Sequence, residues 1–249
     1  MAKLPGLSRG IGRRYRTRSK LGIVRDAFKN SARAISHFSN PVNRLKTAGT
    51  LAKSGYRYAT TKREKTVPDE VRSHAQFAKA SYGRGDKRLR EINGAVLNPD
   101  LSSSTLAVYT HPDTNKHHIS IRGTDPKNVG DLADDVGLVS GRPKRNSHRM
   151  QEISHTVRQL GGDKDNITLY GHSLGGALAD AASVQHGIRS HNFNPGMSPV
   201  SRAHNDLSHN YLIAGDPVSN FGMGDLKKGT YTMFEDQGKG SAHTIDQFL

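Results

Sequence analysis

The segment NITLYGHSLGGALAD, at positions 166–180, sets a serine between glycines where a β-favouring run gives way to a helical pattern. A Gly-x-Ser-x-Gly segment between a strand and a helix is typical of a nucleophile elbow, a sharp turn that exposes the serine hydroxyl. Side chains at Gly171 and Gly175 would collide with neighbouring backbone in such a turn. The pattern therefore favours Ser173 as a nucleophile over a purely structural turn. It also makes the Leu174 N–H, at the start of the helix, a donor for an oxyanion.

A serine nucleophile needs a base and an acid that orients the base, and in this type of fold they follow in the order Ser, Asp, His. Asp216 comes directly after the apolar run in YLIAGDPVSN, where a loop would hold its carboxylate at the carboxyl edge of a sheet. After Asp216 the chain contains one histidine, His243. The order therefore selects His243 as the base, against the alternative of an incidental surface histidine. The rival downstream acids follow no strand as clear: Asp206, Asp225, Glu235, Asp236 and Asp246.

Strand and helix patterns alternate through the remainder of the chain. They predict a helix that begins at the cap Thr66-Val-Pro-Asp-Glu and ends at about Ser81, followed by a hairpin that turns at 112–115. Further helices are predicted near 147–160 and at 174–186, and strands at 166–170, 190–194 and 210–214. This alternation predicts an α/β fold with a mostly parallel central sheet and an antiparallel hairpin at its beginning.

The charge of the chain is divided unevenly. Residues 1–66 hold 17 of the 37 Lys and Arg and two acidic residues, so the whole net charge of +15 lies there and residues 67–249 are neutral. We expect a basic N-terminal arm over 1–66 and a globular domain over 67–249. Within the arm, residues 1–20 are typical of disorder, a short basic amphipathic helix is predicted over 21–38, and 39–66 has the composition of a loop.

Three partners suit the arm: non-specific nucleic acid, an anionic membrane surface, or a targeting receptor for a mitochondrial presequence. The start of the chain lacks the apolar core of a secretion signal, and no apolar run reaches the 18–20 residues that span a bilayer. We therefore expect a soluble or peripheral membrane protein, inside a cell or in a virus particle. The absence of cysteine excludes disulfides, a thiolate nucleophile and zinc–thiolate sites.

Five segments in register resemble the successive signatures of class 3 lipases, the family of the fungal triacylglycerol lipases. The segments are ISIRGT at 119–124, DLADDV at 131–136, ITLYGHSLGGALA at 167–179, LIAGDPVS at 212–219 and HTIDQF at 243–248. Their order and separations are similar to those of the family over about residues 68–249.

The resemblance implies an α/β-hydrolase that cleaves a carboxylic ester of a lipid through an acyl-enzyme, without metal or organic cofactor. It implies Ser173 as nucleophile, Asp216 as orienting acid and His243 as base. The residue after the Arg-Gly pair, Thr124, would join Leu174 in the oxyanion hole. The domain is small and shows no long apolar lid. A basic segment, GLVSGRPKRNSHRM at 137–150, would favour anionic phospholipid over neutral triglyceride.

Two alternatives remain open at this level. The first is a nucleic-acid-associated structural protein with an inactive lipase-like domain. The second is a thioesterase or acyltransferase that uses the same triad, because these enzymes differ from a hydrolase only in the acyl group's carrier or acceptor. His172, beside the nucleophile, is interpreted as packing in the elbow and not as a second base.

Overall fold

The computed structural model describes residues 52–123, 148–196, 206–216, 218–219 and 230–249. Within these residues the strands form one sheet in the order β1-β9-β8-β7-β6-β5-β4-β3-β2. The strands are β1 (Arg63–Glu64), β2 (Glu91–Ile92), β3 (Ala95–Asn98), β4 (Leu106–Thr110), β5 (His117–Ile121), β6 (Ile167–His172), β7 (Arg189–Phe193), β8 (Ser208–Ile213) and β9 (Tyr231–Phe234). Pairing from β5 through β9 to β1 is parallel, and pairing from β2 to β5 is antiparallel. The predicted α/β fold with a mostly parallel sheet is thereby confirmed.

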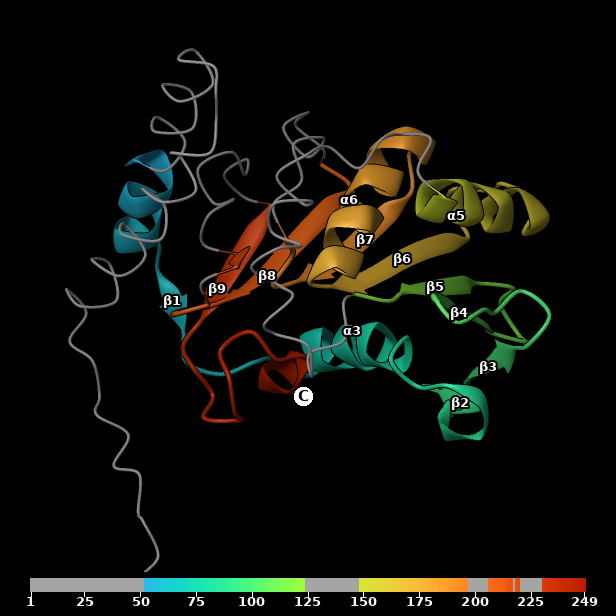
Figure 1. Cartoon of the computed structure of the whole chain (residues 1–249), viewed down its shortest axis with the longest axis horizontal. Helices are drawn as coiled ribbons and strands as arrows, with labels where there is room; N and C mark the ends of the chain where they lie inside the picture. Colours follow the sequence, from blue (N-terminus) through green and yellow to red (C-terminus); the bar gives the residue numbers. More distant parts are fainter. Residues whose placement is uncertain (1–51, 124–147, 197–205, 217, 220–229) are drawn as a thin grey trace, which may run out of the picture.

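Helices cover both faces of the sheet (Figure 1). Helix α3 (Asp69–Ala80) and the short C-terminal 3-10 helix η5 (Ile245–Phe248) pack on one face, and α5 (His148–Gln159) and α6 (Leu174–His186) pack on the other. Neighbouring strand residues alternate between the two cores, so Tyr109 packs with α3 whereas Leu106 packs with α5 and α6. The sheet is thus the middle of three layers. No helix among the described residues is long and apolar enough to cross a membrane.

The predicted hairpin is confirmed, with β4 and β5 paired from Leu106↔Ile121 to Thr110↔His117. The predicted strands at 166–170, 190–194 and 210–214 correspond to β6, β7 and β8, and the helices near 147–160 and at 174–186 correspond to α5 and α6. The first helix differs at its start. It begins at Asp69 with Pro68 in the cap position and no side-chain capping bond, whereas Thr66 is exposed outside it. Pro68 has φ −65° and ψ 155°, the extended conformation usual for the residue before a helix, so the helix begins after the proline and not at Thr66.

The edge strand β1 precedes residue 67, the predicted start of the globular domain. Strand β1 pairs in parallel with β9, and residues 52–60, expected to be loop, are helical. Tyr58 from this helix packs on the buried pair Leu212 and Met233. The predicted arm helix over 21–38 and the predicted disorder over 1–20 lie outside the described residues.

A row of histidine and tyrosine side chains crosses the sheet beneath α3. Tyr170, His191 and His209 are register partners on β6, β7 and β8, and the ring of His74 from α3 stacks on His191 at 3.7 Å. His118 Nδ1 lies 3.0 Å from the Tyr170 hydroxyl. Burial lowers the pKa of His191 to about 3 and that of His118 to about 4, and it also lowers the pKa of His74 and His209. These imidazoles are therefore neutral in the folded protein near neutral pH.

The buried row predicts acid sensitivity of the fold. Below pH 6.5 the unfolded chain takes up protons at imidazoles that stay neutral in the folded state, so these histidines should lower the free energy of unfolding as the pH falls, and the contribution of His191 should level off near pH 3. Each such histidine contributes at most about 1.4 kcal/mol per pH unit. Urea unfolding between pH 7 and pH 4 should show a shallower fall for His191→Gln than for the wild type. Replacing the exposed His155 by Gln should leave the slope unchanged, and equal slopes for all three proteins would contradict the assignment.

Candidate active site

The predicted elbow is present between β6 and α6. Ser173 has φ 56° and ψ −127°, a conformation that costs about 1–3 kcal/mol for a residue with a side chain. A Cβ atom at Gly171 would overlap the carbonyl oxygen of Gly175, and one at Gly175 would overlap the carbonyl oxygen of Ile121. Both flanking residues must therefore be glycine, because the backbones of β5, β6 and α6 meet there without room for a methyl group.

Ser173, His243 and Asp216 form one line of hydrogen bonds. His243 Nε2 lies 2.9 Å from Ser173 Oγ, and His243 Nδ1 lies 3.0 Å from Asp216 Oδ1. Ser173 ends β6, Asp216 follows β8, and His243 lies in the segment between β9 and η5. The structure thus brings together the three residues selected from the sequence by their order.

The Asp216 carboxylate fixes the proton positions along this line. Its side chain is fully buried, and it accepts backbone N–H bonds from Val218 to Oδ1 at 3.0 Å and from Ser219 to Oδ2 at 3.1 Å. An ionised carboxylate can only accept, so Nδ1 of His243 carries the proton that faces it. In the neutral ring Nε2 is then an acceptor, which is the form that can take the proton of the Ser173 hydroxyl.

Of the two predicted oxyanion donors, the structure describes one, Leu174. Leu174 is the first residue of α6, and its N–H belongs to the first turn, whose N–H groups have no partner within the helix. Thr124, the other predicted donor, lies outside the described residues. Its neighbour Gly123 lies against the serine, since a Cβ at Gly123 would stand 3.3 Å from Ser173 Cβ. The end of β5 therefore runs beside the nucleophile.

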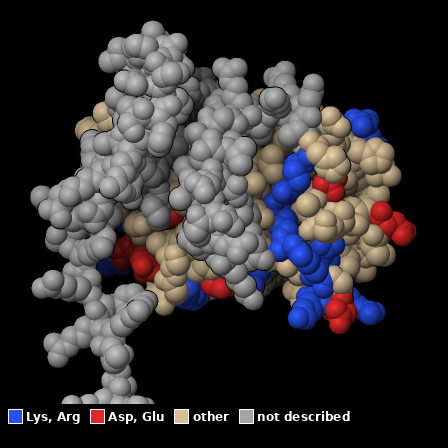
Figure 2. All heavy atoms as spheres, viewed as in Figure 1, with Lys and Arg blue, Asp and Glu red and all other residues tan. Residues whose placement is uncertain are grey.

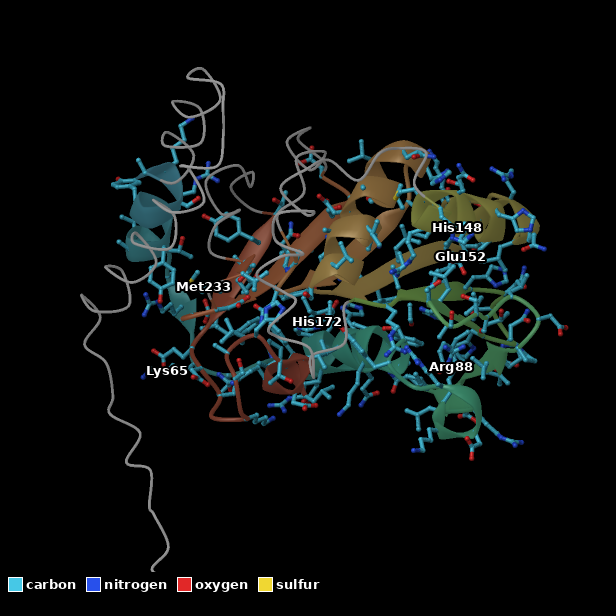
Figure 3. All side chains as sticks on the ribbon, in the orientation of Figure 1. Lys65, Arg88, His148, Glu152, His172 and Met233 are labelled. Carbon is cyan, nitrogen blue, oxygen red and sulfur yellow. The ribbon has the colours of Figure 1, made fainter. Side chains whose placement is uncertain are left out.

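Three further polar residues surround the triad. His172 is buried, with Nδ1 at 2.8 Å from the Tyr82 hydroxyl and Nε2 at 2.6 Å from the His243 carbonyl oxygen. Figure 3 shows His172 where the sheet meets α3 and the C-terminal segment. Burial lowers the pKa of His172 to about 3, in keeping with the interpretation that it is no second base. Asn194, at φ 39°, donates through Nδ2 to the Ala242 carbonyl oxygen at 2.8 Å.

Sequence reasoning missed Tyr82 and Asn194. Tyr82 follows α3, about 90 residues before the elbow, and carries no motif of its own. Asn194 directly follows β7, and an asparagine at the carboxyl end of a strand is a signal that could have pointed to it. Among the described residues no group of three or more His, Asp or Glu side chains is placed to bind a metal ion.

Fold and site together define a lipase-like α/β-hydrolase. A family model described as Phospholipase-like, Tle-like phospholipase domain, matches residues 54–233, and the chain belongs to this family. The match ends before His243, so the place of this histidine in the site depends on geometry alone.

Solved structures of two lipases are similar to the chain. The Lip2 lipase from Yarrowia lipolytica is 13% identical, with 70% of this chain and 83% of that chain covered and a TM-score of 0.42. The extracellular lipase LipA from Serratia marcescens is 19% identical, with 54% of this chain covered and a TM-score of 0.30. The aligned part spans 26% of that lipase. No curated protein matches the chain in sequence.

The elbow glycines yield a stability prediction. Gly175→Ala should destabilise the protein by at least about 3 kcal/mol or prevent folding, because its methyl group meets backbone that cannot move away. Gly161→Ala is the matched control, since Gly161 has φ +83° but no atom within 4 Å of an added Cβ. Gly161→Ala should lower the free energy of unfolding by about 1 kcal/mol, because alanine is strained at a positive φ even where its methyl group has room. Urea unfolding measures both, and equal losses would show that the elbow is not tightly packed.

Proposed function

We propose that this protein is a serine-dependent lipid ester hydrolase that cleaves a carboxylic ester of a phospholipid through an acyl-enzyme. The observation that carries the proposal is the unbroken line of hydrogen bonds from Ser173 through His243 to the buried Asp216. A serine, an imidazole and a buried carboxylate in this order recur on unrelated folds as the machinery of acyl transfer.

In the first half of the reaction, Ser173 Oγ attacks the ester carbonyl carbon while its proton passes to His243 Nε2. The negative charge that forms on the carbonyl oxygen is stabilised by the N–H of Leu174, with Thr124 as the proposed second donor. Asp216 stabilises the imidazolium form of His243 and keeps the ring in place. The C–O bond then breaks, and the leaving alcohol takes the proton from His243.

In the second half, a water molecule attacks the acyl group on Ser173. His243 accepts a proton from this water and returns it to Ser173 Oγ, which releases the fatty acid. An alcohol in place of water would give transacylation, and a thioester in place of the oxygen ester would give thioesterase activity, so product identity separates these alternatives.

Positive charge close to the elbow supports an anionic lipid as substrate. Arg122 directly precedes Gly123, and Arg149 donates from Nη2 to the Arg122 carbonyl oxygen at 2.6 Å. Figure 2 shows Lys and Arg gathered in a band on the face of the domain that it displays. The phosphate of a phospholipid would be attracted to such a band more than an uncharged triglyceride would. The description of the family as phospholipase-like agrees with this choice.

Loss of the nucleophile is the primary test. Ser173→Ala should lower hydrolysis of phospholipid by roughly 10⁴-fold or more, because the variant lacks the hydroxyl on which the acyl-enzyme would form. Ser208→Ala, which changes a buried serine on β8, is the matched control and should keep its activity within about twofold. Released fatty acid is measured over a panel of anionic phospholipid, zwitterionic phospholipid, triglyceride and thioester. Undiminished release from Ser173→Ala would refute the mechanism, and a preference for triglyceride would refute the substrate class.

The basic arm is proposed to hold the enzyme on an anionic membrane surface. Ahead of the helix at 52–60, residues 1–51 carry 12 Lys and Arg and one acidic residue, Asp26. A lipid ester hydrolase finds its substrate in a membrane surface. Each Lys or Arg near an anionic bilayer contributes about 1 kcal/mol of attraction, and the attraction weakens with salt. A nucleic acid would attract the same charge, so it is the competing outcome of the test.

Charge removal tests the arm in the full-length chain. Replacing Arg13, Arg14, Arg16 and Arg18 by Gln should weaken binding to anionic phospholipid vesicles by at least about 100-fold, with unchanged hydrolysis of a dispersed short-chain ester. The control replaces four exposed cations of the domain, Arg84, Lys87, Arg90 and Lys164, by Gln and should affect vesicle binding less. Vesicle co-sedimentation and titration with double-stranded DNA compare the partners. Unchanged vesicle binding beside lost DNA binding would assign the arm to nucleic acid.

A further inference from the structure

The base of the triad lies on a segment without regular secondary structure. His243 comes between β9 and η5, so no helix or sheet bonds fix its backbone. Two buried side chains reach this backbone from the sheet. His172 contacts the carbonyl oxygen of His243 at 2.6 Å, and Asn194 contacts that of Ala242 at 2.8 Å. Successive carbonyl groups of the base segment are thus held from the carboxyl ends of β6 and β7.

The direction of the bonds through His172 follows from their partners. A carbonyl oxygen can only accept, so His172 Nε2 carries a proton and donates a hydrogen bond to the backbone carbonyl oxygen of His243. The ring is neutral, which leaves Nδ1 as an acceptor for the Tyr82 hydroxyl at 2.8 Å. The hydroxyl of Tyr82 then donates to Nδ1, and this bond stabilises the tautomer of His172 that can hold the base segment.

Tyr82 is in turn fixed by the end of β5. A Cβ on Gly123 would stand 2.6 Å from the Tyr82 hydroxyl and 2.5 Å from the His172 carbonyl oxygen, so the three residues are packed without spare room. The guanidinium of Arg122 lies over the Tyr82 ring, 5.6 Å from its centroid. The hydroxyl thus links the β5 end, which precedes Thr124, to the backbone of the base.

Asn194 makes a second link, to the strand that carries the acid. Its Oδ1 accepts the N–H of Ile213 at 2.9 Å, and its own N–H donates to the Tyr211 carbonyl oxygen at 2.8 Å. Asp216 follows Ile213 by three residues and bonds to it through its own N–H at 3.1 Å. The segment that bears the base is therefore bonded to the same end of β8 that bears the acid.

We propose that Tyr82, His172 and Asn194 are positioning residues that hold the backbone of the base segment, so that one imidazole reaches both Asp216 and Ser173. The expected effect on kcat rests on the proposed function. The position of the His243 ring does not, because it can be observed without turnover. Precise placement matters because a displacement of about 1 Å in a catalytic group can cost about 100-fold in rate.

The experiment compares Tyr82→Phe with Tyr109→Phe in the full-length protein. Each change removes one hydrogen-bonded hydroxyl and keeps the ring. Tyr109 is the control because its hydroxyl donates to the Leu89 carbonyl oxygen at 2.9 Å, in the antiparallel half of the sheet. Tyr82→Phe should lower kcat about 10-fold with KM within about twofold, because the bond acts on the base and not on substrate binding. Tyr109→Phe should keep kcat within about twofold at a similar loss of Tm.

A second pair tests the donor itself. His172→Gln retains an N–H that can reach the His243 carbonyl oxygen, whereas His172→Leu has none, so kcat should decrease from wild type to Gln to Leu. Asn194→Asp keeps the acceptor for Ile213 and removes the donor to Ala242, and should lower kcat in the same way. Equal losses of kcat for the Gln and Leu variants would overturn the role of the N–H.

Proton NMR of the imidazole separates this inference from the proposed function. The His243 Nδ1 proton, held by Asp216, should give a protected low-field signal in the wild type and in Tyr109→Phe, and a broadened or absent one in Tyr82→Phe. An unchanged signal together with an unchanged kcat in Tyr82→Phe would overturn the positioning role. A wild type without ester hydrolysis would refute the proposed function, and the signal would still decide whether Tyr82 positions His243.

Discussion

The contact of three backbones at the elbow glycines is the constraint on which the site depends. With no side chain on Gly171 or Gly175, the first turn of α6 lies directly on β6 and on the end of β5. Ser173 is then forced to a positive φ, and its hydroxyl points out of the turn toward His243. A single methyl group would push these backbones apart. Ser173, the N-terminus of α6 and the end of β5 would then no longer lie together on one side of the site.

Parallel strand pairing explains how distant residues reach this point. In a parallel sheet the carboxyl ends of neighbouring strands lie at the same edge, and β5, β6, β7, β8 and β9 are consecutive neighbours. Each of these strands ends at the site. The residues that follow them in order are Gly123, Ser173, Asn194, Asp216 and, after a short segment, His243. The chain order of Ser173, Asp216 and His243 is therefore the spatial order of the strands that they follow.

Sequence reasoning succeeded where a local rule determines the structure. A serine flanked by two glycines requires one backbone geometry, and Asp216 and His243 followed from chain order after a strand. Sequence reasoning failed where the deciding contact is long-range. Strand β1 is short, and its place comes from pairing with β9, about 170 residues further along the chain. Tyr82 belongs to the site only because α3 packs under β6, which no residue pattern near Tyr82 reveals.

The two histidines of the site show how surroundings divide one side-chain chemistry into two roles. The rings of His172 and His243 are 5.0 Å apart. His172 is fully enclosed between a hydroxyl and a carbonyl group, and burial lowers its pKa to about 3, so it gains no proton during a reaction near neutral pH. The His243 side chain is 14% exposed, its Nδ1 faces the buried Asp216 carboxylate at 3.0 Å, and its Nε2 lies 2.9 Å from Ser173 Oγ. In the proposed reaction the proton of Ser173 therefore passes to His243, while His172 donates a hydrogen bond to the segment that carries this base.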